Sequence, residues 1–183
     1  TRINVSQVVV TGPGAPAIGI VDDLAGHEVF VRKGGIYEES LVALNTQLKA
    51  RNKPAVVIDG APEVLEDDDI LEMVNAGLVP MTIVENHLAE FWQQVFTGIT
   101  LNPGAAVSTG AETGMMVRKG NPQLLAELNA FLARYPEGSL QRNVLRQKYL
   151  QSLKYAKPAT SEAEIARFRQ VVDLMRKYSA QYD

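Results

Sequence analysis

The residues best placed to do chemistry are Lys33, Gly34 and Gly35, which follow a short apolar segment and come before a helical one. Glycines let backbone N–H groups turn toward a ligand, and the positive end of a helix dipole attracts anions. Such a turn can bind a carboxylate or a phosphate through the N–H groups from Gly34 to Tyr37. A βα turn that merely needs flexible residues explains the same pattern, because two adjacent glycines are neither a Walker loop nor a dinucleotide fingerprint.

A second candidate is Glu85, which ends the apolar segment 79–85 just before Asn86, a residue that can cap a helix. In open α/β sheets, ligands bind beyond the carboxyl ends of the strands. A carboxylate at that place could hold an ammonium group. A solvated carboxylate near a helix start is the alternative, and the residues alone leave both open.

The remaining reactive residue types form no catalytic or metal-binding pattern. The acidic run 63–69 lacks the spacing of a calcium loop and suits the first turn of a helix. His27 and His87 lie far apart in the sequence and belong to no HExxH motif. Ser108 has no histidine beside it to activate a nucleophile. We therefore expect no catalytic residue, no metal and no cofactor.

Composition narrows the class of protein. The chain of 183 residues has 46% apolar and 21% charged residues, as soluble globular proteins do. A net charge of −3 gives no reason to expect a nucleic-acid partner, and the absence of cysteine excludes disulfides and thiolate chemistry. No apolar run approaches the ~18 residues of a transmembrane helix. The chain begins at Thr1 with no apolar leader, so we expect any export signal to lie outside it.

Strand and helix patterns alternate over the first hundred residues. Apolar, β-branched segments predict strands, and apolar residues at helical spacing predict helices. The expected strands are 3–11, 28–32, 55–59, 79–85 and 99–101, and the expected helices are 37–51, 67–76 and 87–96. This order predicts an α/β fold with a parallel sheet and covering helices.

The later part of the chain is expected to be mostly helical. A strand is predicted over 114–119, helices over 121–135 and 139–153, and a last helix after the linker 155–160. The helix 121–135 is expected to bury Leu124, Leu128, Phe131 and Leu132. The last helix has the spacing of a coiled-coil face at Ile165, Phe168, Val172 and Met175.

Three segments, in this order, resemble family-3 extracellular solute-binding proteins, the type that binds amino acids. DDLAGHEVFVRKGGIYEESLVALN resembles the beginning of that family's second lobe, and EMVNAGLVPMTIVENHLAEFW resembles the strand and helix that follow. AETGMMVRKGNPQLLAELNAFL resembles the strand and helix that return to the first lobe. The resemblance covers about residues 7–133. The most similar version is the solute-binding-like regulatory module of membrane-bound lytic murein transglycosylases of the F type, in which residues 152–183 correspond to a connector.

The resemblance implies a periplasmic-binding-protein-like lobe and a location for its ligand. Residues 14–107 would form the second, ligand-binding lobe. Residues 1–13 and 108–155 would be crossing strands and a first-lobe remnant, and 156–183 a helical connector to a catalytic domain outside the chain. Lys33, Gly34, Gly35 and Ile36 fall where family members hold the ligand's carboxylate, and Glu85 falls where an Asp grips its ammonium group. Gly35 lacks the usual hydroxyl, and Glu85 is longer than Asp. The ligand implied is therefore an amino acid, a peptide or a muropeptide-like molecule, and a degenerate site that binds none of them is an equal alternative.

The implied function is ligand binding and regulation within a cell-envelope enzyme that remodels peptidoglycan, without catalysis by this chain. The expected location is the periplasm, with association to the outer membrane. Expected partners are a small-molecule ligand, a lysozyme-like domain of the same polypeptide and a second copy of the chain, because helix 121–135 would lack its first-lobe partner. Two alternatives are a periplasmic amino-acid receptor of an ABC importer and a free-standing small α/β enzyme.

Overall fold

The computed structural model describes residues 2–150 and 162–182 and divides into two compact units. One unit runs from Arg2 to Thr113, and the other begins at Gly114. The expected linker 155–160 lies outside the described residues, and so do the side chains of Ile165 and Phe168.

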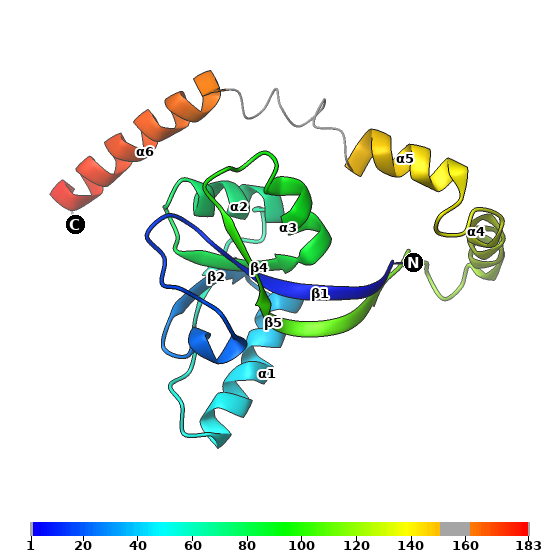
Figure 1. The fold of residues 1–183 in the computed structure, drawn as a ribbon, viewed down its shortest axis with the longest axis horizontal. Coiled ribbons are helices and arrows are strands. Elements are labelled where there is room, and N and C mark those ends of the chain that lie inside the picture. Colours follow the sequence, from blue (N-terminus) through cyan, green and yellow to red (C-terminus); the bar gives the residue numbers. More distant parts are fainter. Residues whose placement is uncertain (1, 151–161, 183) are drawn as a thin grey trace. The chain divides into compact units, whose positions relative to one another are not determined.

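The first unit is built on a strand that has neighbours on both sides. Strand β1 (Arg2–Thr11) lies between β4 (Met81–Glu85) and β5 (Thr100–Thr113), and both pairings are antiparallel (Figure 1). The three consecutive valines 8–10 of β1 are buried. A run of β-branched residues forms this strand because it can be covered on both faces.

A second, two-stranded sheet is parallel. It consists of β2 (Glu28–Arg32) and β3 (Val57–Ala61), which pair with Val29 opposite Ile58. Strand β2 is buried along its middle, whereas β3 is mostly exposed, as an edge strand is. The predicted α/β class is confirmed; the strand pairing is mixed, with one parallel pair and one antiparallel trio.

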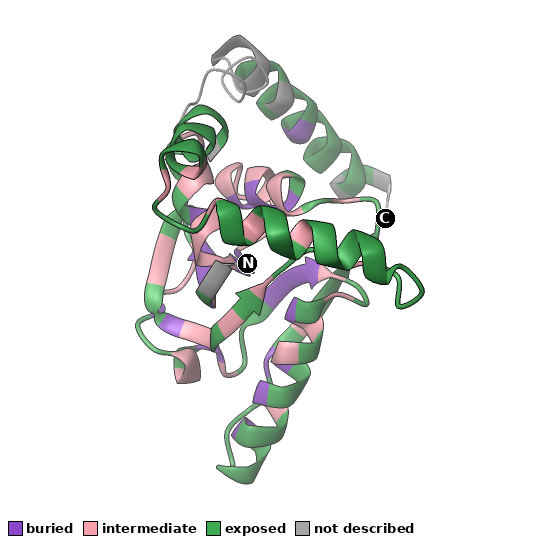
Figure 2. Cartoon of the chain, turned by 90° about the vertical axis from the view of Figure 1, so that its right-hand side faces the viewer, coloured by how far each residue is buried: buried purple, intermediate pink, exposed green. Residues whose placement is uncertain are grey.

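Helices follow the strands as the spacing of apolar residues predicts. The short 3-10 helix η1 (Val21–Leu24) is followed by α1 (Ile36–Ala50), α2 (Asp67–Asn75) and α3 (Asn86–Trp92). Helix α1 buries one side and exposes the other (Figure 2). The Asn45 side chain fixes it to the start of β3, since it donates to the carbonyl of Val56 at 3.0 Å and accepts from its N–H at 2.7 Å.

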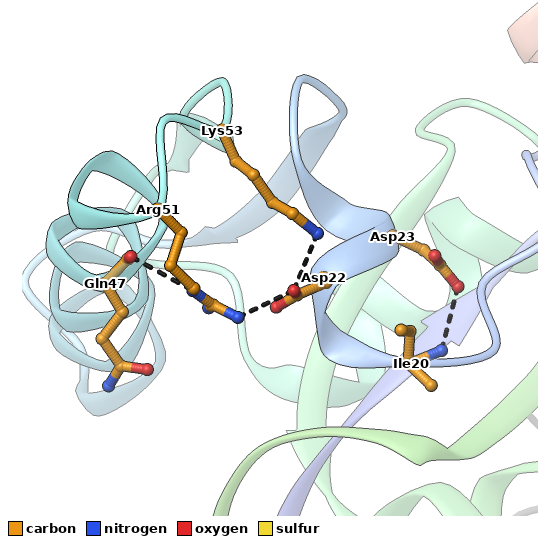
Figure 3. Close-up of polar contacts among 6 residues, drawn as sticks. All are labelled: Ile20, Asp22, Asp23, Gln47, Arg51 and Lys53. Atoms are coloured by element: carbon orange, nitrogen blue, oxygen red, sulfur yellow. Dashed lines mark hydrogen bonds and ion pairs between the residues drawn. The ribbon is translucent and has the colours of Figure 1, made fainter.

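Polar contacts hold η1 against the end of α1 (Figure 3). The Asp22 carboxylate accepts hydrogen bonds from Arg51 at 2.7 Å and Lys53 at 2.8 Å. These bonds, that from Lys53 first, hold the pKa of Asp22 below its ordinary value. The neighbouring Asp23 accepts from the N–H of Ile20 at 2.9 Å. These contacts fix the segment between β1 and β2 to the end of α1 through a cluster of charged side chains.

Several sequence-based expectations about the bounds of strands and helices need correction. The short strand 99–101 is part of β5, which continues to Thr113. The predicted strand 55–59 begins two residues later, at Val57. No strand forms over 114–119, because within the described residues that segment has no partner strand. Helix α3 ends at Trp92, four residues before the predicted end, and a turn follows it.

The second unit is helical, with α4 (Pro122–Arg134), α5 (Leu140–Leu150) and α6 (Glu162–Tyr182). Helix α4 has no buried residue, and Leu124 and Phe131 are about half exposed. The prediction that α4 buries its apolar face is therefore wrong for this chain. Among the described residues, no helix has the length and apolar character needed to cross a membrane.

Candidate ligand-binding site

The ends of three strands and the beginnings of three helices supply the residues predicted to bind a ligand. Strand β2 ends at Arg32 and α1 begins at Ile36, while β4 ends at Glu85 and α3 begins at the next residue. Strand β3 ends at Ala61, before α2. In α/β proteins this edge, beyond the carboxyl ends of the strands, is where ligands bind.

Tyr37 joins these segments. Its side chain is buried, with 8% of its surface exposed. Its hydroxyl donates to Oδ2 of Asp67 at 3.1 Å and accepts from the N–H of Glu85 at 3.2 Å. One hydroxyl thus connects the first turns of α1 and α2 to the end of β4, so the Gly34–Tyr37 turn and Glu85 lie at one edge of the first unit.

Burial sets the electrostatics of this contact. Burial, followed by the negative charge of Asp67, raises the pKa of Tyr37 above its ordinary value. Burial also raises the pKa of Asp67, although the hydrogen bond from Tyr37 and the charge of Arg32 act in the opposite direction. Tyr37 therefore stays protonated at neutral pH and can act only as a hydroxyl.

The glycine turn has the conformation that the sequence suggested, and the N–H groups of both glycines already have partners within the chain. Gly34 has φ = +72°, a left-handed conformation that favours glycine. Its N–H donates to Oε2 of Glu38 at 2.6 Å, and the N–H of Gly35 donates to the carbonyl of Arg32 at 3.3 Å. A ligand carboxylate at this turn would therefore compete with the Glu38 carboxylate for Gly34.

Two cationic side chains lie at the ends of the parallel strands. Arg32 forms an ion pair with Glu66 at 2.7 Å. Lys33 is exposed. Its aliphatic carbons pack beside Gly60, since a Cβ added to Gly60 would lie 3.6 Å from them, at van der Waals distance. The Lys33 side chain thus starts beside the glycine turn and packs next to Gly60. Ile36, also predicted to lie at the site, is 58% exposed.

Glu85 has a neighbour that the sequence did not indicate. Its Oε2 lies 3.5 Å from Nδ1 of His87, and both side chains are largely covered, with 22% and 18% of their surfaces exposed. Burial of this degree differs from the solvated carboxylate of the alternative interpretation. When His87 is protonated, it forms an ion pair with Glu85 and competes with any ligand ammonium group for that carboxylate.

Sequence reasoning missed two residues at this edge, Asp67 and Gln7. Asp67 looked like one member of an acidic run at a helix start, and its contact with Tyr37 is visible only in three dimensions. Gln7 lies in β1 with Glu85 opposite on one side and Ser108 opposite on the other. A glutamine directly before three valines was the available signal, because an amide is unusual in a buried strand.

Comparison with known proteins relates the chain to one curated relative. No family model matches it. It is 30% identical over 129 residues to a membrane-bound lytic murein transglycosylase F from Pseudomonas syringae pv. tomato, a match that covers 69% of the chain and 24% of the relative. The chain thus spans about a quarter of the length of that relative.

Solved structures with the same fold are binding proteins. An ancestral arginine-binding protein bound to glutamine has a TM-score of 0.58 at 20% identity, covering 80% of this chain and 60% of that one. The substrate-binding protein of an amino acid ABC transporter has a TM-score of 0.52 at 23% identity, covering 82% and 61%. A periplasmic binding protein of Salmonella typhimurium with high arginine specificity has a TM-score of 0.54 at 21% identity, covering 81% and 61%. The chain therefore has the fold of the family-3 solute-binding proteins that its sequence resembles, and it is similar in sequence to part of a membrane-bound lytic murein transglycosylase F.

Proposed function

We propose that this module binds a small ligand at the edge formed by Lys33, Gly34, Gly35, Ile36, Tyr37 and Glu85, and that it regulates a lytic murein transglycosylase of the cell envelope. The observation that supports this most is the Tyr37 hydroxyl, which connects the glycine turn to Glu85 through the N–H of that residue. The turn offers backbone donors and Lys33 for a carboxylate, and Glu85 offers an acceptor for an ammonium group. An amino acid, a peptide or a muropeptide-like molecule carries both groups.

In this proposal the chain itself performs no catalysis, and a lysozyme-like domain of the same polypeptide cleaves the glycan. Residues 14–107 serve as the ligand-binding lobe, 1–13 and 108–155 as crossing strands and first-lobe remnant, and 156–183 as the connector. The sequence similarity to a transglycosylase supports this organisation. The location that follows is the periplasm, with attachment to the outer membrane. Ligand binding would shift the balance between conformations and so change the activity of the attached domain.

A receptor for an ABC importer is the second candidate, because the proteins with the same fold include the substrate-binding protein of an amino acid ABC transporter. The two candidates differ in what the full polypeptide does. If the first is right, the full polypeptide releases anhydro-muropeptides from purified sacculi, the 183-residue chain does not, and ligand changes the rate of release. If the second is right, neither releases them, and deletion of the gene abolishes uptake of the ligand.

Binding is tested by NMR titration of the chain with three probes: L-arginine, L-glutamine and the stem peptide L-Ala-γ-D-Glu-meso-diaminopimelate. We expect at least one probe to shift the amide resonances of Gly34 to Tyr37 and of Glu85. Glu85→Gln should weaken binding of that probe about tenfold or more, because a charge-assisted hydrogen bond contributes roughly 1.5–3 kcal/mol. Glu90→Gln, an exposed position on α3, is the matched control. Absence of shifts with all three probes, or shifts confined to other residues, would contradict the proposed site.

A further inference from the structure

Gln7 is a buried amide in a strand that buries mainly apolar side chains. It is 4% exposed, and its Oε1 accepts no hydrogen bond from any residue in the described part of the chain. The other buried polar residue of β1, Thr11, does have partners: its hydroxyl donates to the carbonyl of Thr100 and accepts from Asn102. Buried polar groups are nearly always hydrogen bonded, and an unpaired acceptor destabilises the fold, so Gln7 calls for an explanation.

The strand register places Gln7 at the proposed site. Gln7 is paired with Glu85 across β1 and β4. Directly paired residues of antiparallel strands project to the same face, with Cβ atoms about 4.5–5.5 Å apart. The adjoining backbone is fixed as well, because the N–H of Ser6 donates to Oδ1 of Asn86 at 3.2 Å. The amide of Gln7 and the carboxylate of Glu85 therefore start from neighbouring positions on one face.

Two neighbouring acceptors suit one kind of ligand group. A carboxylate accepts hydrogen bonds only, so the Glu85 side chain offers no donor to the Gln7 amide oxygen. An ammonium group has three N–H donors and no acceptor, and it can bond to both oxygens at once. Glu85 alone would leave some of those donors without a partner in a covered site.

We propose that the side-chain oxygen of Gln7 is a ligand-binding group, which accepts a hydrogen bond from the ammonium group whose charge Glu85 balances. This inference rests on the proposed function and assigns the site to ligands with a free primary ammonium group. Because Gln7 is covered, the ligand can reach it only if neighbouring side chains rotate, and side-chain rotations are fast compared with binding. The unpaired oxygen is then a feature kept for the ligand at a cost to the stability of the unliganded protein.

The test replaces Gln7 by Met, which has a similar length and no acceptor of comparable strength. The 183-residue chain and its Gln7→Met variant are titrated by NMR with the same three probes and with their N-acetylated forms. Gln7→Met should weaken binding of the free-ammonium probes about tenfold and leave binding of the acetylated forms unchanged. Its melting temperature without ligand should be no lower than that of the wild type, because the substitution removes an unpaired buried acceptor. Gln47→Met, at an exposed position of α1, is the matched control.

The outcomes separate this inference from the proposed function. Equal binding by wild type and Gln7→Met overturns the role of Gln7 and leaves the site at Glu85 standing. A clear fall in the melting temperature of Gln7→Met, with affinity unchanged, means that the amide has a structural role instead. If the wild type binds none of the probes, the proposed function fails, and the role of Gln7 fails with it.

Discussion

At the scale of single residues, Tyr37 is the contact on which the site depends. Its hydroxyl is hydrogen bonded to both Asp67 and the N–H of Glu85. Tyr37→Phe leaves a partly buried carboxylate and a backbone N–H without this partner. We expect it to lower the free energy of unfolding by about 1–3 kcal/mol and to weaken ligand binding as well.

Urea denaturation followed by circular dichroism measures this change in stability. The matched control is Tyr135→Phe, since the ring of Tyr135 packs against Phe131 at a centroid distance of 5.0 Å in the second unit. A Tyr37→Phe variant as stable as the control would show that the hydroxyl contributes nothing to the fold.

Asp67 and Asp22 should give pH dependences of opposite sign. Burial raises the pKa of Asp67 above 3.8. Asp67 therefore contributes to the stability of the fold below pH 3.8, and this contribution is lost as pH rises through the raised pKa. Lys53 and then Arg51 hold the pKa of Asp22 below 3.8, so its contribution is present above that value and is lost as pH falls. Between about pH 3 and 7, Asp67→Asn should therefore gain stability relative to the wild type, and Asp22→Asn should lose it.

Thermal unfolding at stepped pH measures both variants against the wild type. Each variant serves as the control for the other, because their differences from the wild type should diverge as pH rises. If the stability differences of the two variants from the wild type change in the same direction with pH, the opposite pKa shifts of Asp67 and Asp22 are wrong.

The site residues divide into those with a local signal and those without one. Gly34 and Glu85 could be proposed from the sequence, because a glycine pair before a helix and an acid at a strand end are recognisable along the chain. Gln7 and Asp67 were not. Gln7 depends on the register between β1 and β4, and Asp67 depends on packing between two helix starts. Neither contact can be recognised from residues that are adjacent in the sequence.

At the scale of elements, the end of β1 meets the last turn of α2 at Gly12. The N–H of Gly12 donates to the carbonyl of Pro80 at 2.9 Å, and a methyl group built on Gly12 would overlap the carbonyl oxygen of Val74. Gly12→Ala must push strand and helix apart, and we expect it to cost about 1–3 kcal/mol of stability.

Chemical denaturation measures this cost, with Gly120→Ala as the control. A Cβ at Gly120 would meet no atom within 4 Å, so that substitution should change stability by about 0.5 kcal/mol or less. Equal effects of the two substitutions would mean that α2 and β1 have room between them.

Element boundaries were least predictable where pairing decides them. Asn102, Pro103 and Gly104 favour a turn, yet β5 continues through them because β1 offers a partner, with register shifts that absorb the irregular residues. The segment 114–119 has the composition of a strand but no partner among the described residues. Helix α1, by contrast, was predicted closely, since its buried leucines mark one face without reference to other elements.

At the scale of the whole molecule, apolar side chains of the second unit are left uncovered. Large apolar residues at least 45% exposed occur along α4 and α5: Leu124, Leu125, Phe131, Leu140, Val144, Leu145 and Tyr149. Burying one such side chain contributes roughly 1.5–3 kcal/mol, and contiguous apolar surface commonly marks an association site. We therefore expect the chain to self-associate, most simply as a two-fold dimer.

Light scattering at high micromolar concentration tests this expectation against the monomer mass of 20.0 kDa. The double substitution Leu124→Gln and Phe131→Gln should shift the mass toward the monomer and leave the melting transition of the first unit unchanged. A wild-type chain that remains a monodisperse monomer would contradict the prediction.

The position of β1 also has a consequence for how the chain folds as it is synthesised. The strand at the centre of the sheet, β1, is synthesised before both of its neighbours, β4 and β5, which are made much later. Contacts between residues so distant in the sequence slow folding, because the intervening chain must be ordered before they form. Until Thr100 and the residues after it emerge, the valines 8–10 have no partner on the β5 side. Until both neighbours have been made, the nascent chain therefore exposes an unpaired, apolar β-strand edge, and such edges favour association with other chains or with chaperones.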